Sequence, residues 1–429
     1  MTAEIAVMNR KAVALAADSA VTIGGSGKIY SSENKLFTIS KYHPIGIMIF
    51  NNAQFMNIPW EVIIKSYRND IGDKSFDTVK SCSEHFLNWL RNIQKQILSE
   101  QERADFIATT FINTATNLSA NARNHMLELI YSKSESDTVE QSDVEDAFMN
   151  FFEEAKKILK ENDRICDLKP SDILLDEKAI PKLIEVSLER AEVKIKLSKK
   201  KLDLIKHVTF EVICKHMTNY TGVVFAGFGE EEYFPSITSY KIDALYDGKL
   251  KYILFKETDN RGLATIIPFA QSEMVNRFIE GIDPAFMNFF GEYIEDIINE
   301  YPSKILDSLP DIETSKKKSL TKQISKISKS LKEDLRQNLE EFTNEKFVQP
   351  IISNLDNLPL DELAEMALSL VNITSFKRKV SIDELETVGG PVDVAVITKG
   401  DGFIWIKRKH YFDPKLNHHF FNNYYRKKD

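Results

Sequence analysis

The sequence opens with Met1-Thr2-Ala3-Glu4-Ile5-Ala6-Val7-Met8, reaches the polar trio Asn9-Arg10-Lys11, and continues as Ala12-Val13-Ala14-Leu15-Ala16-Ala17-Asp18. Two apolar runs on either side of a short polar turn are typical of a β-hairpin. If the turn is centred on Arg10, the numbers of opposed residues add up to about twenty, so Thr2 faces Asp18. A slip of one residue would still leave the two as neighbours. The pattern therefore places a hydroxyl group and a carboxylate together at the open end of the first hairpin.

Thr2 follows directly on the initiator methionine. Threonine is small enough for Met1 to be removed, which would make Thr2 the mature N-terminus. A terminal α-amine has a pKa of about 7.7–8.0, so it is partly neutral in a cell and can accept a proton. It lies within reach of the hydroxyl of its own residue, so that nucleophile and base are combined in Thr2. The alternative is that Thr2 is an ordinary second residue.

The residues after the hairpin bear on this choice. A glycine-rich turn at residues 24–27 is followed by Asn34-Lys35-Leu36-Phe37, the start of an apolar strand. This tetrapeptide, Thr2 and the stretch Ala14-Leu15-Ala16-Ala17-Asp18-Ser19 resemble the proteasome β-type members of the N-terminal nucleophile hydrolase superfamily, in the same order and with similar spacing. The resemblance implies that the threonine is the nucleophile and that the aspartate and the lysine set the charge state around it.

Elementary electrostatics agrees with these roles for Asp18 and Lys35. A lysine ammonium beside the terminal amine disfavours a second positive charge and so lowers the pKa of the amine, while a carboxylate at Asp18 keeps the lysine charged. Taken singly, Lys35 is typical of a solvated strand and Asp18 of a turn. The occurrence of all three in the expected order favours a catalytic set of Thr2, Asp18 and Lys35.

Other positions depart from the family pattern. The buried-looking strand Ile45-Gly46-Ile47-Met48-Ile49-Phe50 ends at Asn51 and Asn52, where the family has a glycine whose N–H forms the oxyanion hole. We expect the backbone N–H of Asn51 or Asn52 to take this role, because asparagine tolerates unusual φ and ψ angles. A helical stretch from Ala53 to Tyr67 is expected to follow.

The family also has a serine that supports the terminal amine, and a second acidic residue. Ala270 falls near the position of the serine and has no hydroxyl, so Ser272 or Gln271 would have to substitute. Both are equally good residues for the start of a helix. The second acid has three candidates shortly before the Gly389-Gly390 pair, namely Asp383, Glu384 and Glu386.

The resemblance implies an α+β protein with a four-layer αββα core, here interrupted by two large helical insertions. Charge-rich segments with apolar residues at helical spacing mark the insertions. The predicted segments are the core in residues 1–97, 206–280 and 356–410, the helical insertions in 98–205 and 281–355, and an aromatic and basic tail in 411–429. Amphipathic helices must bury their apolar sides. We expect them to pack on the outer helices of the core or over the mouth of the Thr2 cleft, which favours a small assembly or a monomer.

Composition limits the class of protein. The net charge of −8 over 429 residues is modest, so nucleic acid is not expected as a partner. The lysine runs of the second insertion also lack interleaved aromatic residues. Three scattered cysteines without metal or disulfide spacing fit a reduced compartment. The N-terminus does not read as a signal peptide, and no apolar run is long enough to span a membrane. We expect a cytoplasmic protein that needs no metal and no cofactor.

The expected function is that of a threonine-type amidohydrolase or peptidase, which cleaves a peptide or other amide bond through an acyl-enzyme on Thr2. The alternative, from a different class, is a catalytically silent scaffold of the same fold whose helical insertions bind protein partners. Ala270 and the unmatched second acid favour that alternative. A homo-oligomer fits either hypothesis. A third and weaker interpretation makes the basic helices an RNA-binding module.

Overall fold

The computed structural model describes residues 2–22, 29–30, 33–40, 43–131, 141–195, 197–259, 264–308, 314–381 and 389–425. The expected glycine turn and the candidate acids Asp383, Glu384 and Glu386 lie outside these residues. The chain forms two compact units. The first comprises Met1–Leu36, Tyr233–Pro235 and Asp259–Asp429, and the second comprises Phe37–Glu232 and Ser236–Thr258.

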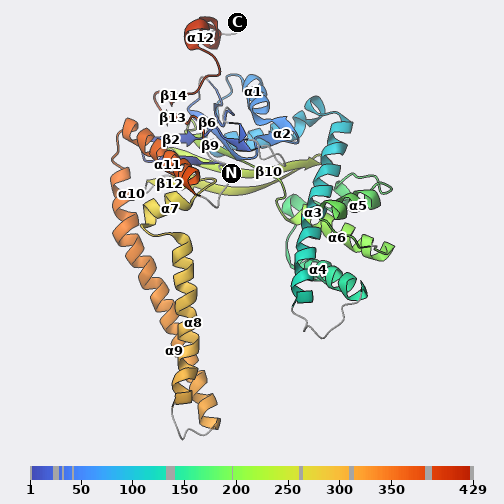
Figure 1. The fold of residues 1–429 in the computed structure, drawn as a ribbon. Coiled ribbons are helices and arrows are strands. Elements are labelled where there is room, and N and C mark those ends of the chain that lie inside the picture. Colours follow the sequence, from blue (N-terminus) through green and yellow to red (C-terminus); the bar gives the residue numbers. More distant parts are fainter. Residues whose placement is uncertain are drawn as a thin grey trace. The chain divides into compact units, whose positions relative to one another are not determined.

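A five-stranded antiparallel sheet with the strand order β12-β1-β2-β13-β14 forms the centre of the first unit (Figure 1). Its strands are β1 (Glu4–Met8), β2 (Ala12–Ala17), β12 (Thr265–Pro268), β13 (Asp393–Thr398) and β14 (Gly402–Lys407). A separate ribbon pairs β3 (Val21–Thr22) with β4 (Ile29–Tyr30). The N-terminal hairpin expected from the sequence is confirmed, and strands from far along the chain flank it on both sides.

One face of this sheet is covered by α11 (Leu360–Val380). Alternate residues of the hairpin point to that face, because successive side chains of a strand face opposite sides. These residues are Ala3, Ile5, Val7, Ala12, Ala14 and Ala16, and they meet Leu363, Ala367, Leu370 and Val371 of the helix. The alanines of β2 let the helix approach the sheet closely. Each fully buried leucine or valine in this layer stabilises the unit by roughly 1.5–3 kcal/mol.

The register of the N-terminal hairpin differs by one residue from the expected one. The main-chain N of Asp18 donates to the carbonyl of Ala3 (3.1 Å), so that Ala3, and not Thr2, lies directly beside Asp18. The cause is Asn9, whose side-chain Oδ1 accepts hydrogen bonds from two main-chain N–H groups further along (3.0 and 3.2 Å). A turn built around such a side chain is one residue longer than the one assumed. Thr2 remains close to Asp18.

A second five-stranded sheet, with the strand order β11-β10-β9-β6-β5, forms the centre of the second unit. Its strands are β5 (Leu36–Thr38), β6 (Ile45–Asn51), β9 (Thr221–Gly227), β10 (Ser236–Tyr246) and β11 (Lys249–Asp259). The helices α1 (Trp60–Ile71) and α2 (Val79–Ile97) belong to its core. Phe86 of α2 lies 6.2 Å from Trp60 and 5.3 Å from Phe225 of β9, measured between ring centroids. The two antiparallel sheets and many helices confirm the α+β class.

The helix expected from Ala53 begins only at Trp60. The residues before it form a small hairpin of β7 (Gln54–Phe55) and β8 (Ile58–Pro59). Its turn places Met56 and Asn57 at positive φ (49° and 68°), a conformation that two-residue hairpin turns require and that asparagine tolerates. The prediction of a helix over these residues was therefore wrong.

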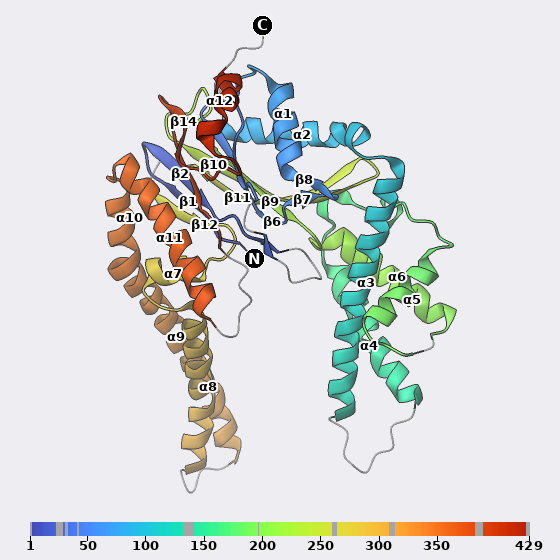
Figure 2. The same cartoon turned by 45° about the horizontal axis from the view of Figure 1, so that its top comes forward.

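Helices fill most of the remaining chain (Figure 2). In the second unit they are α3 (Glu100–Tyr131), α4 (Gln141–Glu161), α5 (Ile180–Arg190), α6 (Lys199–Lys215) and the short turns η1 (Ile165–Asp167) and η2 (Pro170–Asp172). In the first unit they are α7 (Glu273–Glu280), α8 (Pro284–Ser308), α9 (Thr314–Thr343), the π-helical turn η3 (Asn344–Val348), α10 (Gln349–Leu355), η4 (Pro414–Leu416) and α12 (His418–Tyr425). No helix in the described ranges is both long and apolar enough to cross a lipid bilayer.

The helix α8 runs beside α9 and leaves an apolar stripe exposed. Five of its residues, spaced three or four apart, are 43–63% exposed; they are Phe286, Phe289, Tyr293, Ile297 and Tyr301. We expected the insertions to bury their apolar sides on the core, and α8 does not do so within the first unit.

Candidate active site

The three residues that the sequence marks as catalytic come together at one end of the sheet of the first unit. Thr2 lies two residues before the start of β1, Asp18 directly follows β2, and Lys35 directly precedes β5. Their exposed fractions are 2%, 0% and 3%. Burial of charged groups is costly unless they are paired and hydrogen-bonded. The contacts of these side chains therefore define the site.

Asp18 accepts hydrogen bonds from three different parts of the first unit. The Nζ of Lys35 donates to Oδ1 (2.6 Å), as does the main-chain N of Ala3 (3.2 Å). The main-chain N of Gly389 donates to Oδ2 (2.9 Å). Asp18 therefore joins the N-terminal strand, the lysine and the segment that leads into β13.

The Gly389-Gly390 pair before β13 contributes through its main chain. Gly390 has a φ of +77°, in the left-handed region that residues with a side chain rarely adopt. Gly389 donates to Asp18, and its carbonyl accepts a hydrogen bond from the main-chain N of Ser19 (3.3 Å). The Oγ of Ser19 also donates to the carbonyl of Pro391. These bonds hold the end of β2 against the start of β13.

The structure adds Glu4, which we did not single out from the sequence. Thr2 Oγ1 donates a hydrogen bond of 2.9 Å to Glu4 Oε2, and Lys35 Nζ lies 3.1 Å from Glu4 Oε1. Two residues that are two positions apart on extended chain face the same side, which brings Thr2 and Glu4 together. Glu4 is 1% exposed in a strand whose other members are apolar. A lone carboxylate in an otherwise apolar strand, two residues after Thr2, was its signal in the sequence.

Glu4, Asp18 and Lys35 form a buried cluster of two acids and one base. Burial raises the pKa of Glu4 from 4.5 to about 7. The charge of Lys35 and the hydrogen bond from Thr2 lower this pKa, whereas the charge of Asp18 raises it. One lysine cannot neutralise two carboxylates, so Glu4 exchanges a proton readily near neutral pH. The cluster can therefore take up and release a proton next to Thr2 Oγ1.

Gln271 and Ser272, the residues expected to support the terminal amine, lie between β12 and α7. This segment starts beside β1, because the main-chain N of Phe269 donates to the carbonyl of Glu4 (2.9 Å). Gln271 Oε1 accepts a hydrogen bond from Arg378 Nε of α11 (2.9 Å). Ser272 precedes the first turn of α7 and makes no capping bond with its side chain. Their support of Thr2 stays a prediction.

Asn51 and Asn52 lie at the end of β6 in the second unit. Asn51 has a φ of +71°, so it takes the unusual backbone conformation that the sequence suggested. Its Nδ2 donates to the carbonyl of Tyr220 (2.7 Å), and Asn52 Nδ2 donates to Asn219 Oδ1 (3.1 Å). The side chains thus tie the end of β6 to the segment before β9. The oxyanion role of their N–H groups stays a prediction.

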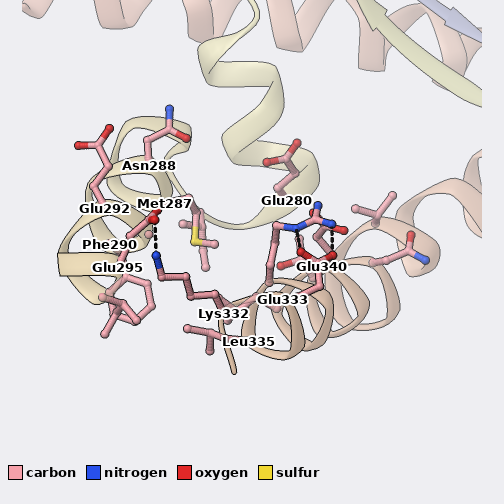
Figure 3. A pocket seen from close by; sticks show the side chains of 18 of the residues that line it. Glu280, Met287, Asn288, Phe290, Glu292, Glu295, Lys332, Glu333, Leu335 and Glu340 are labelled. Atoms are coloured by element: carbon pink, nitrogen blue, oxygen red, sulfur yellow. Dashed lines mark hydrogen bonds and ion pairs between the residues drawn. The ribbon is translucent and has the colours of Figure 1, made fainter. Parts of the chain in front are cut away.

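A cavity of about 920 Å³ lies in the first unit between α8, α9 and η3 (Figure 3). Five of the charged groups on its wall are paired with one another, since Lys332 bridges to Glu295 and Arg336 donates to Glu333 (2.6 Å) and Glu340 (2.7 Å). Two smaller cavities, of about 650 and 470 Å³, lie beside α6 in the second unit. None of these three cavities is lined by the cluster around Thr2, so we place no substrate in them.

The chain matches no protein-family model and no curated protein. Among solved structures, it is similar to Anbu from Hyphomicrobium sp. strain MC1, with a TM-score of 0.27 and 10% identity over 98% of this chain and 94% of that chain. Anbu (ancestral β-subunit) from Yersinia bercovieri gives a TM-score of 0.28 and 9% identity over 98% and 94%. A Gly-1 mutant of the Hyphomicrobium Anbu gives 0.28 and 10% over 100% and 99%. Likeness at such TM-scores carries no weight for the function, which we argue from the site alone.

Proposed function

We propose that the protein is an N-terminal-threonine hydrolase, which attacks a peptide or other amide bond with Thr2 Oγ1 after removal of Met1. The observation that carries this proposal is the buried network at the start of the chain. Thr2, Asp18 and Lys35 come from separate stretches of sequence. Glu4 contacts Thr2 (2.9 Å) and Lys35 (3.1 Å), and Lys35 contacts Asp18 (2.6 Å). A hydroxyl that donates to a carboxylate beside a lysine is the arrangement of an activated nucleophile.

The reaction would proceed through an ester on Thr2. The hydroxyl oxygen adds to the carbonyl carbon of the substrate while its proton passes to a base, and the amine then leaves with a proton. Water hydrolyses the ester and restores the hydroxyl. The backbone N–H of Asn51 or Asn52 would stabilise the oxyanion, and Ser272 or Gln271 would support the terminal amine.

The fold that we propose for this enzyme is the four-layer αββα sandwich of proteasome-like N-terminal nucleophile hydrolases. Each unit by itself supplies a five-stranded sheet and helices packed on it, α11 in the first unit and α1 and α2 in the second. Two such halves are what a sandwich with two inner sheets and two outer helical layers requires.

A β-lactone probe tests the nucleophile, because its strained ring acylates an activated hydroxyl and leaves a stable mass increase. We expect one probe per chain, located at Thr2 by tandem mass spectrometry. Thr2→Ala should abolish the adduct, and Thr2→Ser, which keeps an Oγ, should retain it. Thr398→Ala is the matched control, since Thr398 is another buried hydroxyl of the same sheet. Equal labelling of the parent and of Thr2→Ala would refute the assignment of Thr2.

The burial of Thr2, which is 2% exposed, favours a second candidate function, namely a scaffold without catalysis. A probe must displace whatever covers the hydroxyl before it can react. In a scaffold the exposed stripe on α8 would bind a protein partner, and no probe would attach to Thr2 whether or not Met1 is removed. The intact mass of the purified chain, measured with and without the probe, separates the two candidates.

A further inference from the structure

The hydroxyl of Thr2 needs a proton acceptor, and the chain offers two. One is the amine of Thr2 itself after loss of Met1, and the other is the carboxylate of Glu4. We propose that Glu4 is the general base for Thr2, so that the hydroxyl is activated without help from the terminal amine. This inference rests on the proposed function, in which Thr2 is the nucleophile.

The geometry of the contact supports this role. Thr2 Oγ1 and Glu4 Oε2 are 2.9 Å apart, within the distance over which a general base removes a proton. When Glu4 is ionised it can only accept, so the hydroxyl of Thr2 is the donor and its proton points to the carboxylate. The contact is present in a chain that carries Met1, in which the nitrogen of Thr2 belongs to a peptide bond and is not basic. The pairing of Thr2 with Glu4 therefore requires no processing.

The charges around Thr2 make the amine a poor base. Among the described residues, the charged side chains that face Glu4 are Asp18 at the end of β2 and Lys35 before β5. From the segment after β12, the main-chain N–H of Phe269 bonds to the carbonyl of Glu4. Lys35 is shared by two carboxylates, so a new ammonium at Thr2 would meet a surplus of negative charge whenever Glu4 is ionised, which is the state in which Glu4 can act as a base. Such a surplus holds the proton on the amine more tightly and offsets the effect that we expected from Lys35.

A complete proton path follows from this arrangement. Thr2 Oγ1 attacks the carbonyl carbon of the amide while its proton passes to Glu4 Oε2. The C–N bond then breaks, and Glu4 returns that proton to the leaving nitrogen. In the second half, a water gives a proton to Glu4 and attacks the ester, and Glu4 reprotonates Thr2 Oγ1 as the acid leaves. A base whose pKa is raised towards neutral suits both transfers, because it must accept and donate in turn.

Acetylation of the N-terminus separates the two bases. An anhydride is applied to the unfolded chain, in which the α-amine has its ordinary pKa of about 7.7–8.0 and is modified ahead of the lysines. The chain is then refolded, and intact mass confirms a single acetyl group. N-acetyl-Thr2 keeps its hydroxyl and has no basic nitrogen. We expect the β-lactone to label the acetylated chain within about tenfold of the parent rate. Glu4→Gln, with a free amine, should react about 10²–10⁴-fold more slowly, which is the usual contribution of a general base. If the purified chain keeps Met1, the nitrogen of Thr2 is already part of a peptide bond. That chain then serves in place of the acetylated one.

Two further variants control for damage to the fold. Glu4→Asp keeps a carboxylate on a shorter side chain and should retain a rate between those of the parent and Glu4→Gln. Asp243→Asn removes a buried carboxylate that pairs with Lys251 (2.7 Å) in the second unit, and it should react like the parent. Thermal unfolding identifies the variants that are folded.

Three outcomes are decisive. Loss of labelling on acetylation, or labelling of a folded Glu4→Gln chain at the parent rate, would overturn Glu4 as the base. If Glu4→Gln does not fold, the acetylated chain and Glu4→Asp decide in its place. A parent chain that is not labelled at all would instead refute the proposed function, so the two failures are distinguishable.

Discussion

Replacing Glu4 by glutamine removes a buried acid and keeps the size of the side chain, so it should change how the stability of the first unit depends on pH. Burial is the main reason that the pKa of Glu4 is raised from 4.5 to about 7, and Asp18 adds to the effect. Each pKa unit corresponds to about 1.4 kcal/mol. Ionising Glu4 in the folded chain therefore lowers the free energy of unfolding by about 3 kcal/mol relative to its protonated form.

The sign of the effect follows from proton binding. Folded Glu4 holds its proton up to about pH 7, whereas the unfolded chain releases it near the ordinary pKa of 4.5. Between these values the folded state binds more protons, so the stability that protonated Glu4 contributes is complete below pH 4.5 and is lost as the pH rises through about 7. The Glu4→Gln chain has no such titration. Relative to the parent, it should gain about 3 kcal/mol between about pH 4.5 and pH 8.

Amide hydrogen exchange of peptides from β1 and β2 measures this pH-dependent change in stability locally. It reports the free energy of opening of the strands that carry the site. The parent and Glu4→Gln are compared at several pH values between about 5 and 8, at constant ionic strength and with the same N-terminal processing. Rates are corrected for intrinsic exchange. Asp243→Asn, in the second unit, should leave the exchange of β1 and β2 unchanged. The quantity to compare is the opening free energy of β1 and β2 in Glu4→Gln minus that in the parent. If this difference stays constant within about 1 kcal/mol over the pH range, or falls as the pH rises, a buried and protonated Glu4 is refuted.

Three further changes probe the same unit. Lys35→Met removes the ammonium that both carboxylates contact, so labelling of Thr2 should fall and the pKa of Glu4 should rise further. A labelling rate that matches the parent across neutral pH would contradict this. Asp18→Asn should slow labelling by about tenfold, less than Glu4→Gln does, because Lys35 keeps one carboxylate; the reverse order of the two rates would contradict the assignment of the base. Gly390→Ala introduces a Cβ at a φ of +77° and should cost about 1–2 kcal/mol in thermal unfolding, whereas Gly400→Ala, with nothing within 4 Å of its added Cβ, should be nearly neutral.

The N-terminal hairpin was predictable because its signals are local. Two apolar runs flank a polar turn, and the alternation along β1 and β2 carries the period of a strand. The exact pairing was not predictable in this way. It depends on the side chain of Asn9, which accepts two main-chain N–H groups and shifts the register by one residue. The late start of α1 has a similar cause, because Asn57 supports a turn at positive φ where the apolar pattern indicated a helix.

Glu4 shows why the site could only partly be predicted. In a strand, a lone charged residue between alanine and isoleucine usually indicates a solvent-facing position. Whether it is solvated or buried depends on what covers that face of the strand, and this is decided by segments far along the chain. The pKa of Glu4 depends mainly on burial, so its chemistry could not be inferred from the order of residues.

By itself, the sequence determined the N-terminal hairpin and its apolar pattern, and it placed Thr2, Asp18 and Lys35 in an order that points to a nucleophile and its tuning charges. These features depend on neighbours along the chain and on the period of a strand. Only the tertiary structure decided that Lys35 reaches both Asp18 and Glu4, that Gly389 closes the cluster, and that Thr2 Oγ1 donates to Glu4. The reason is physical, because the strength of a charge pair and the pKa of an acid depend on distances of a few ångströms and on the exclusion of water. Both arise only when distant segments pack together.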